Sequence, residues 1–307
     1  MGMYRYDIGL GNKYLFGNEL EFTGVYLEEL SKQLRSSSLP VRYAINHKSR
    51  GYTKYDEWYL DLDSTVTRKE DGKYFGGELS SRILTDKKKI WMEVKDICDV
   101  LKYVGAYVNE RCSNHVRVNL SSIRDERYFF EVLSKLIALY EVEIRLFYMG
   151  DDYYVRRTSF EYARPLATYL LDYINKVNFS ADDFYYRFRN NGITLFSRND
   201  GINLQEYEEK RLMEIRYANG TINEKTIQNN SNFSLKLVDA IDRKVFDPQE
   251  LTKRIEDGGR KLIFKHISDE SDFKEFEWLV RSIATSEEDI DDFMTQYEHV
   301  LSKRPRV

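Results

Sequence analysis

Two glutamates one residue apart are the first candidates for chemistry in this sequence. In the stretch FGNELEF, residues 16–22, Glu19 and Glu21 lie inside an otherwise apolar run. Alternate side chains of a strand share a face, so both carboxylates point one way while Leu20 and Phe22 point the other. With attachment points about 7 Å apart and an effective dielectric near 20, the two charges repel each other by roughly 2 kcal/mol. We therefore expect a cation nearby.

Further segments alternate polar and apolar residues in the same way. In HVRVNL, for example, the three apolar residues form one face, whereas His115 and Arg117 belong to the other. Strands are predicted at residues 58–64, 77–84, 115–120, 192–199 and 212–217. Their polar residues add to the candidates: Asp61 or Asp63, Glu78, His115, Arg117, Arg198, Glu214 and Arg216.

This set of side chains favours hard-cation and anion chemistry. Carboxylate oxygens with few soft ligands suit Mg²⁺ or Mn²⁺, ions that usually bridge to substrate phosphates. Arginines bind phosphate or carboxylate oxygens with two parallel hydrogen bonds. The sequence has no phosphate loop GxxxxGK[ST], no HExxH, no GxSxG and no EF-hand loop. Its four histidines and two cysteines are scattered, which argues against a zinc site.

Each candidate also has a purely structural interpretation. A single ExE in a strand is more often a solvated sheet face, and His115 alone is more often a hydrogen-bonded structural histidine. Residues 63–65 read equally well as a turn, and Glu214 with Arg216 as an ordinary ion pair. A functional site is favoured because several strands carry pairs of polar residues on one face and apolar residues on the other.

The elements that must position these residues indicate an α+β domain. Helical spacing of apolar residues occurs at 27–34, 90–104 and 129–140, and a further helix is expected over 164–176. We expect a largely antiparallel, curved sheet with helices packed on its apolar face and its charged face left open. After residue 241 the pattern changes to short acidic helical pieces. We therefore predict a catalytic domain over 1–241 and a helical C-terminal appendage over 242–307, with a break at 257–259.

Composition excludes several classes of protein. The 307 residues are 42% hydrophobic and 14% aromatic, as expected of an ordered globular chain, and no apolar run of about 18 residues predicts a membrane span. The net charge of −4 disfavours nucleic acid as a partner. With no secretory signal pattern and two cysteines, we expect a reducing cytoplasm.

An ordered set of short motifs resembles the amidoligase family. These motifs are FGNELEF, DLDST, GGELSSRIL, GAYVNERCSNHVRVN and MEIRYANGTIN, and the resemblance spans roughly residues 14–240. That family is similar to the catalytic domains of glutamine synthetase and glutamate-cysteine ligase. Its pattern is matched at Gly17, Glu19, Glu21, Asp61, Asp63, Ser64, Glu78, Leu79, His115, Val116, Glu214, Arg216, Gly220 and Thr221.

The chain departs from this family pattern at two places. Ser81 and Arg82 stand where serine and proline are usual, and Arg117 replaces the second histidine of the HVH strand. Arg117 either serves an anion or blocks a metal position, so the number of metal ions stays open. Also similar to the family is an arginine ahead of a tyrosine and proline region, here Arg156 and Arg157.

The resemblance implies ATP-dependent joining of a carboxylate to an amine through an acyl phosphate. It implies that Glu19, Glu21, Glu78 and Glu214 are ligands of Mg²⁺ or Mn²⁺, and that His115 lies near the metal and the nucleotide phosphates. The substrates would be a small-molecule or peptide carboxylate and an amine. The C-terminal helices could contact a protein acceptor or mediate a homo-oligomer.

The remaining roles that the resemblance implies belong mainly to arginines. Arg216 and Arg198 would stabilise the transferring phosphoryl group, and Arg117 would contribute to the nucleotide site. Arg157 would bind a substrate carboxylate, and Asp63 would accept the amine proton.

Two other functions fit the same residues. A degenerate amidoligase-like module that binds a nucleotide or a partner is suggested by the departures at Ser81, Arg82 and Arg117. A metal-dependent phosphodiesterase or nuclease would also use acids, one histidine and arginines. ATP-independent degradation of DNA or RNA would indicate the nuclease, and nucleotide binding without any product would indicate the binding module.

Overall fold

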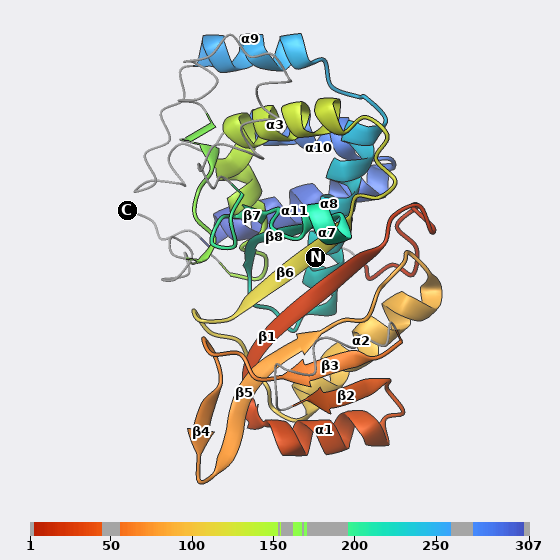
Figure 1. Cartoon of the computed structure of the whole chain (residues 1–307), viewed down its shortest axis with the longest axis vertical. Helices are drawn as coiled ribbons and strands as arrows, with labels where there is room; N and C mark the ends of the chain where they lie inside the picture. The colour runs from red at the N-terminus through yellow and green to blue at the C-terminus, as the bar shows by residue number, and fades with distance from the viewer. Residues whose placement is uncertain are drawn as a thin grey trace.

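A single mixed sheet forms the centre of the molecule (Figure 1). The computed structural model describes residues 3–44, 56–152, 154, 162–167, 169–170, 196–258 and 273–303. Within these residues the strand order is β2-β3-β5-β1-β6-β8-β7, and β4 pairs with β5. All neighbouring pairs are antiparallel except β2 with β3. The strands are β1 Phe16–Tyr26, β2 Val41–Ala44, β3 Trp58–Asp61, β4 Arg68–Glu70, β5 Lys73–Ser80, β6 Ser113–Asn119, β7 Ile202–Asn203 and β8 Leu212–Asn219.

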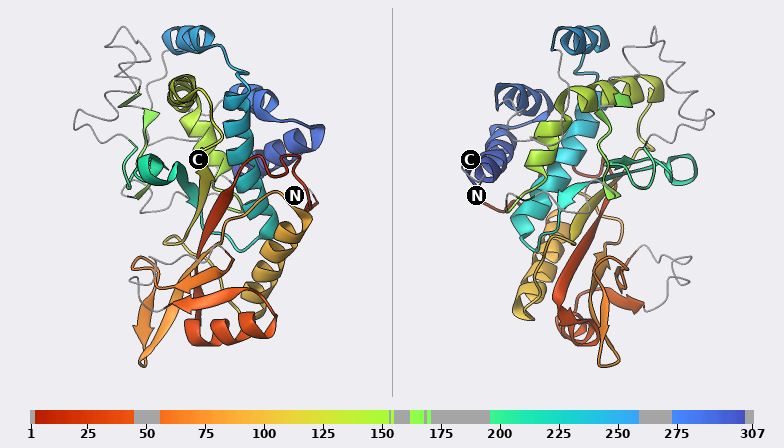
Figure 2. Two further views of the ribbon diagram at one scale, coloured as in Figure 1. Left: turned by 45° about the vertical axis from the view of Figure 1, so that its right-hand side comes forward. Right: turned by 90° about the vertical axis from the view of Figure 1, so that its left-hand side faces the viewer.

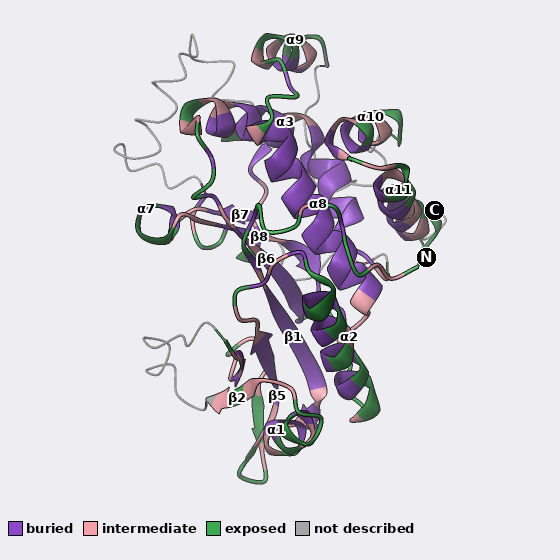
Figure 3. Cartoon of the chain, turned by 90° about the vertical axis from the view of Figure 1, so that its right-hand side faces the viewer, coloured by how far each residue is buried: buried purple, intermediate pink, exposed green. Residues whose placement is uncertain are grey.

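Helices cover one face of this sheet. In the edge-on view of Figure 3, α2 and α8 run along one side of the sheet, and the short α7 lies on the opposite side. This confirms an α+β fold with a mostly antiparallel sheet. The helices are α1 Leu27–Ser36, α2 Lys88–Tyr103, α3 Glu126–Phe147, α7 Tyr207–Lys210, α8 Glu224–Asp242, α9 Pro248–Gly258, α10 Phe273–Ile283 and α11 Glu287–Ser302. None of the described helices combines the length and the apolar composition that crossing a membrane would require.

The alternation in β1 sorts its residues between the two faces of the sheet. Leu20 and Phe22 are at most 1% exposed and belong to the hydrophobic core. The alternation places Glu19 and Glu21 on the opposite face. Because β1 lies between β5 and β6, a slip of one residue in its register would turn its carboxylates into the core.

Four predicted elements differ from those observed. The strand expected over 77–84 lies at Lys73–Ser80, and it ends where the Ser81 hydroxyl, in place of a backbone carbonyl, accepts the Asn18 amide at 2.8 Å. The strand expected over 58–64 ends at Asp61, because the carboxylate of Asp63 accepts the Thr65 amide at 2.7 Å and closes a turn. The helix expected over 129–140 is longer, since Asp125 caps it by accepting the Tyr128 amide. A strand over 192–199 was wrong for residues 196–199, which form a turn held by the hydrogen bond from the Ser197 amide to Asp200, while 192–195 lie outside the described residues.

The helix expected over 164–176 is only partly described. The Leu170 amide donates to the Leu166 carbonyl at 3.0 Å, which makes one helical turn. Arg164 instead forms an isolated parallel β-bridge with Asp200. Residues 168 and 171–176 lie outside the described part of the chain.

The C-terminal helices pack on α3 and α8. Figure 2 shows α10 and α11 beside these two helices, and the contacts between the elements agree. Phe276 of α10 and Phe293 of α11 belong to the same hydrophobic cluster as Phe147 and Phe233 of α3 and α8. The division of the chain at residue 241 stays a prediction, and 259–272 lie outside the described residues.

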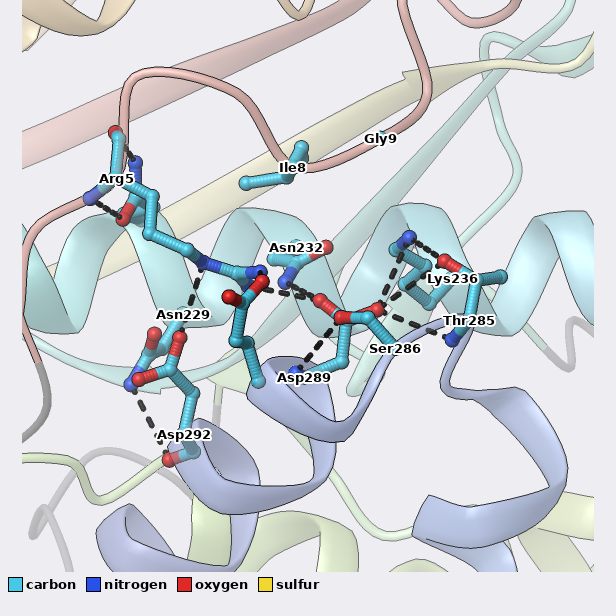
Figure 4. A network of polar contacts seen from close by, with 12 residues as sticks. Arg5, Ile8, Gly9, Asn229, Asn232, Lys236, Thr285, Ser286, Asp289 and Asp292 are labelled. Atoms are coloured by element: carbon cyan, nitrogen blue, oxygen red, sulfur yellow. Dashed lines mark hydrogen bonds and ion pairs between the residues drawn. The ribbon is translucent and has the colours of Figure 1, made fainter.

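Helix α8 is buried although many of its residues are polar. Its side chains face the sheet on one side and α11 on the other, so polar groups must bond across both contacts. Figure 4 shows the contact with α11, where Asp289 accepts hydrogen bonds from Asn232 at 3.0 Å and from Arg5 at 2.8 Å. Lys236 lies 3.1 Å from Asp289, and both side chains are 0% exposed. These contacts fix α11 and the N-terminal segment to α8.

We predict that Asp289→Ala lowers the free energy of unfolding by about 3 to 5 kcal/mol, because Lys236 is left buried without its counter-charge. Urea denaturation at pH 7 measures this loss. The matched control is Asp99→Ala, which breaks the exposed ion pair with Lys95 and should cost no more than about 1 kcal/mol. Equal effects of the two changes would contradict the structural role of the buried network.

Candidate functional site

The register around β1 assembles the candidate residues. Glu19 is paired with Ser80 of β5 on one side and with His115 of β6 on the other, and Glu21 is paired with Glu78. Residues directly opposite each other in antiparallel strands share a face, with Cβ atoms about 5 Å apart. The pairing alone therefore brings acids from two strands and the imidazole together.

The next strand pair extends the same charged face. Arg117 of β6 is opposite Glu214 of β8, which in turn is opposite Asn203 of β7. The Asn203 side-chain amide donates to Glu214 Oε2 at 2.8 Å. Five adjacent strands thus contribute side chains to one surface of the sheet.

These residues line a cavity of about 860 Å³. Its size is within the range of sites that bind small molecules. The four glutamates are only 4–7% exposed, so the charged face is a lined cavity and not the open surface expected from the sequence. Every described candidate except Asp61 lines it: Glu19, Glu21, Asp63, Glu78, His115, Arg117, Arg198, Glu214 and Arg216.

Two candidates differ from the rest in position. Arg198 is exposed, on the turn that follows residue 195, so it lies at the rim of the cavity. Asp61 is buried, and its carboxylate accepts the Leu62 amide at 2.8 Å at the end of β3. Arg157 lies outside the described residues.

The acids form two groups that could each hold a metal ion. Glu19, His115 and Glu214 make up the first, here named the Glu19 cluster, and their ligand atoms lie within 4.8 Å of one another. Glu21, Asp63 and Glu78 make up the second, the Glu21 cluster, under the same distance limit. Carboxylate oxygens with at most one imidazole are donors suited to Mg²⁺ or Mn²⁺.

Hydrogen bonds from neutral groups orient the Glu21 cluster. The Ser113 amide donates to Glu21 Oε2 at 2.8 Å, and the Thr65 amide donates to Asp63. The Ser80 hydroxyl lies 3.2 Å from Glu78 Oε1 and 3.4 Å from Glu19 Oε1, so it lies between the two clusters. The turn expected at residues 63–65 is present, and it presents the Asp63 carboxylate to the cavity.

Arginines neutralise the Glu19 cluster. Arg117 Nη2 is 2.6 Å from Glu19 Oε1 and 3.3 Å from Glu214 Oε1. Arg216 Nη1 lies 3.0 Å from Glu214 Oε2, and its Nε donates to the Tyr162 carbonyl. The cation expected beside Glu19 is therefore supplied by the next strand.

The surroundings shift the pKa values of these groups in a consistent direction. Burial by itself raises the pKa of Glu19, but Arg117 and the hydrogen bond with His115 outweigh it and hold that pKa well below its ordinary range. Burial likewise opposes ionisation of Glu214, whose pKa is nonetheless lowered by Arg117, His115 and Arg216. Both carboxylates are therefore ionised at neutral pH.

His115 has protein partners on both ring nitrogens. Its Nδ1 is 3.0 Å from Glu19 Oε2, and its Nε2 is 2.9 Å from the Ser113 hydroxyl. The imidazole is 5% exposed at the base of the cavity. Its orientation is fixed by these two contacts, as in sites where a second hydrogen bond sets the tautomer.

Sequence reasoning missed two residues that orient the acids. Ser80 lies two positions after Glu78 in the same strand, so the alternation of β5 could have placed it on the charged face. Asn203 belongs to β7, a strand of two residues, which is too short for any periodicity to reveal. Arg111 of the cavity wall lies in a turn and left no pattern either, whereas Tyr162 belongs to the tyrosine and proline region noted in the sequence, where it was given no role.

The family can now be assigned. A family model described as “Putative amidoligase enzyme” matches residues 12–238, which include every described residue of both clusters. The chain belongs to the amidoligase family. This confirms the resemblance seen in the short motifs and supports an enzyme of the carboxylate–amine ligase class. No curated protein matches the sequence of this amidoligase.

Among solved structures, the amidoligase is similar to one titled “Crystal structure of the complex between Prokaryotic Ubiquitin-like Protein Pup and its Ligase PafA”. The TM-score is 0.38 at 11% sequence identity, over 97% of this chain and 65% of that one. This amidoligase therefore spans about 65% of the length of the chain it matches.

The charge pairing in the Glu19 cluster predicts how stability depends on pH. Because the folded-state pKa of Glu19 lies below its ordinary value of 4.5, its ion pair stabilises the fold above that value. The stabilisation is lost as the pH falls through the folded-state pKa. Glu19→Gln should therefore lower the free energy of unfolding by roughly 2 kcal/mol at pH 7, and the difference from wild type should narrow below pH 4.5.

Urea unfolding at pH 7, 5 and 4, on both sides of the ordinary pKa of a glutamate, measures this difference. Glu110→Gln, which changes an exposed acid outside the cavity, is the control and should have little effect at any pH. A difference for Glu19→Gln that stays constant with pH would contradict the ion pair.

Proposed function

We propose that the chain is an ATP- and Mg²⁺-dependent carboxylate–amine ligase that forms an amide or isopeptide bond through an acyl phosphate. The observation that carries the proposal is one cavity in which two carboxylate clusters adjoin arginines, in a chain of the amidoligase family. A curved sheet like that of the glutamine synthetase catalytic domain is part of the same proposal.

The donor atoms of the cavity fit a divalent ion. Glu21, Asp63 and Glu78 would hold one with carboxylate oxygens alone, and Glu19, His115 and Glu214 form the second possible set. A bound Mg²⁺ or Mn²⁺ would supply positive charge to phosphate oxygens.

The first step joins the carboxylate to phosphate. A carboxylate is a poor acyl donor because oxide is a poor leaving group, so its oxygen attacks the γ-phosphorus of ATP and ADP leaves. Negative charge builds on the phosphoryl oxygens during this transfer. Arg216, held by Glu214 and the Tyr162 carbonyl, and Arg198 at the rim would stabilise it. One such donor is typically worth about 3 to 4 kcal/mol.

The second step forms the amide. The amine nitrogen attacks the acyl carbon, the bond to phosphate oxygen breaks, and inorganic phosphate leaves with the electron pair. The nitrogen loses a proton, and Asp63 is the proposed acceptor. Its place beside Glu21 and Glu78 equally supports a ligand role for Asp63. His115 keeps the Glu19 carboxylate oriented toward the cavity.

The proposed chemistry defines the two substrates by their reacting groups. A small-molecule or peptide carboxylate and an amine fit the chemistry, and a protein acceptor or a second copy of the chain are the proposed macromolecular partners. Arg157 stays the predicted contact to a substrate carboxylate. Cytoplasmic location is proposed from the cysteine content, since two cysteines make no disulfide framework.

We predict that wild-type protein with Mg²⁺, ATP and pooled carboxylates releases ADP and, with hydroxylamine as the amine, forms a hydroxamate. Hydroxylamine intercepts acyl phosphates, so the coloured iron complex of the hydroxamate measures the intermediate. Glu21→Gln and Glu214→Gln should each lower the rate of hydroxamate formation by a factor of about 10² to 10³. Each change removes a negative charge that positions the cations of the phosphate-binding site.

The control is Glu110→Gln, which leaves the cavity unchanged and should keep the wild-type rate. Far-ultraviolet circular dichroism checks that the variants fold. Full turnover in Glu21→Gln would remove that residue from the proposed site. Nucleotide binding without product in any pool would replace the ligase with a binding module, and ATP-independent cleavage of DNA or RNA would indicate a nuclease.

A further inference from the structure

We propose that Arg117 is a built-in cation of this site. Its guanidinium takes the place of one divalent ion in the Glu19 cluster, so the chain binds a single exchangeable ion, held by the Glu21 cluster. The inference rests on the metal-binding part of the proposed function and is independent of the ligation chemistry. It resolves whether Arg117 serves as an anion contact or fills a metal position.

Every donor atom of the Glu19 cluster already has a protein partner. Glu19 Oε1 lies 2.6 Å from Arg117 Nη2, and Glu19 Oε2 lies 3.0 Å from His115 Nδ1. Glu214 Oε1 lies 3.3 Å from both Nε and Nη2 of Arg117. Glu214 Oε2 lies 3.0 Å from Arg216 and 2.8 Å from Asn203.

The imidazole of the cluster is engaged in the same way. Its Nε2 lies 2.9 Å from the Ser113 hydroxyl, and its Nδ1 is the partner of Glu19. A divalent ion would have to displace one of these contacts for each ligand that it gained. Mg²⁺ needs oxygen ligands at about 2.1 Å in near-octahedral geometry, which leaves little tolerance for a guanidinium sharing the same oxygens.

The balance of charge also opposes a divalent ion in the Glu19 cluster. Two carboxylates, Glu19 and Glu214, face two guanidiniums, Arg117 and Arg216, so this cluster is neutral before His115 is considered. A divalent ion would leave it with two uncompensated positive charges in a mostly buried place. The Glu21 cluster consists of three carboxylates, so a divalent ion there would add positive charge to negatively charged side chains.

The position of Arg117 also keeps a divalent ion away from the Glu19 cluster. It lies two residues after His115 in β6, so both side chains reach the same face of the sheet. Its side chain is 37% exposed, whereas the carboxylates that it contacts are about 10% exposed. The guanidinium therefore covers the acids from the cavity side, where an ion would otherwise enter.

The experiment counts bound Mn²⁺, used alone without nucleotide, by isothermal titration calorimetry and by the electron paramagnetic resonance signal of the free ion. Wild-type protein should bind one ion. Arg117→His, which offers a neutral ligand, and Arg117→Ala should each bind two. The matched control, Arg111→Ala, removes a different guanidinium from the cavity wall and should still bind one.

Two further variants locate the ion in the wild-type background. Glu21→Gln should weaken Mn²⁺ binding by more than about 10-fold, and Glu19→Gln should leave the affinity within about 3-fold of wild type. These two variants show which cluster holds the ion, even if the chain does not fold without Arg117. Thermal denaturation adds a check, since Mn²⁺ should raise the melting temperature more in Arg117→Ala than in wild type.

Several results would overturn the inference. Two ions in wild type, one ion in a folded Arg117→Ala or Arg117→His, or loss of Mn²⁺ binding in Glu19→Gln would each show that Arg117 does not stand in for an ion. A second ion bound by Arg111→Ala would show that removing any positive charge from the cavity wall admits an ion, so that Arg117 has no special role. If ions are counted as expected but no hydroxamate forms, the ligase proposal fails and the inference about Arg117 stands.

Discussion

The structure depends on keeping like charges together on one buried face of a sheet. Glu19, Glu21, Glu78 and Glu214 come from three strands and are almost inaccessible to solvent, so each must be compensated within the fold. The antiparallel register supplies that compensation for two of them, because it sets Arg117 opposite Glu214 and His115 opposite Glu19. The same pairing that completes the sheet therefore determines the electrostatics of the cavity.

The other face of β1 carries an unusual second constraint. Between the sheet and α8 the contact includes polar groups: Asn230 donates to Asn114, and Ser231 donates to Asn18, in addition to the apolar core. These bonds are directional, so they fix how α8 lies on the strands more tightly than apolar packing alone. Helix α11 then bonds to the far side of α8 through Asp289. The C-terminal helices thereby support the back of the strands whose fronts form the site.

Sequence patterns predicted what depends on local alternation and missed what depends on tertiary partners. The two faces of β1 follow from a period of two, and the expected acids do meet at one cavity. Helix α8 was not among the predicted helices, and many of its buried residues, such as Asn230 and Lys236, are polar and bond to other elements. The separation of the acids into two clusters also could not be predicted, since it depends on the turn that carries Asp63 and on the pairing of β6 with β8.

A fixed guanidinium and an exchangeable ion differ in the charge that they bring to a cavity of this kind and in the conditions under which that charge is present. An ion brings two charges and a rigid ligand geometry, but its presence depends on concentration and on deprotonated ligands. The charge of Arg117 is present whenever the chain is folded, because its pKa is far above neutral and is raised further by Glu19 and Glu214 against the effect of burial. Because strand side chains repeat every second residue, one substitution at this position exchanges a ligand for a charge without altering the register. The sheet can therefore keep its architecture while the number of ions that it needs changes.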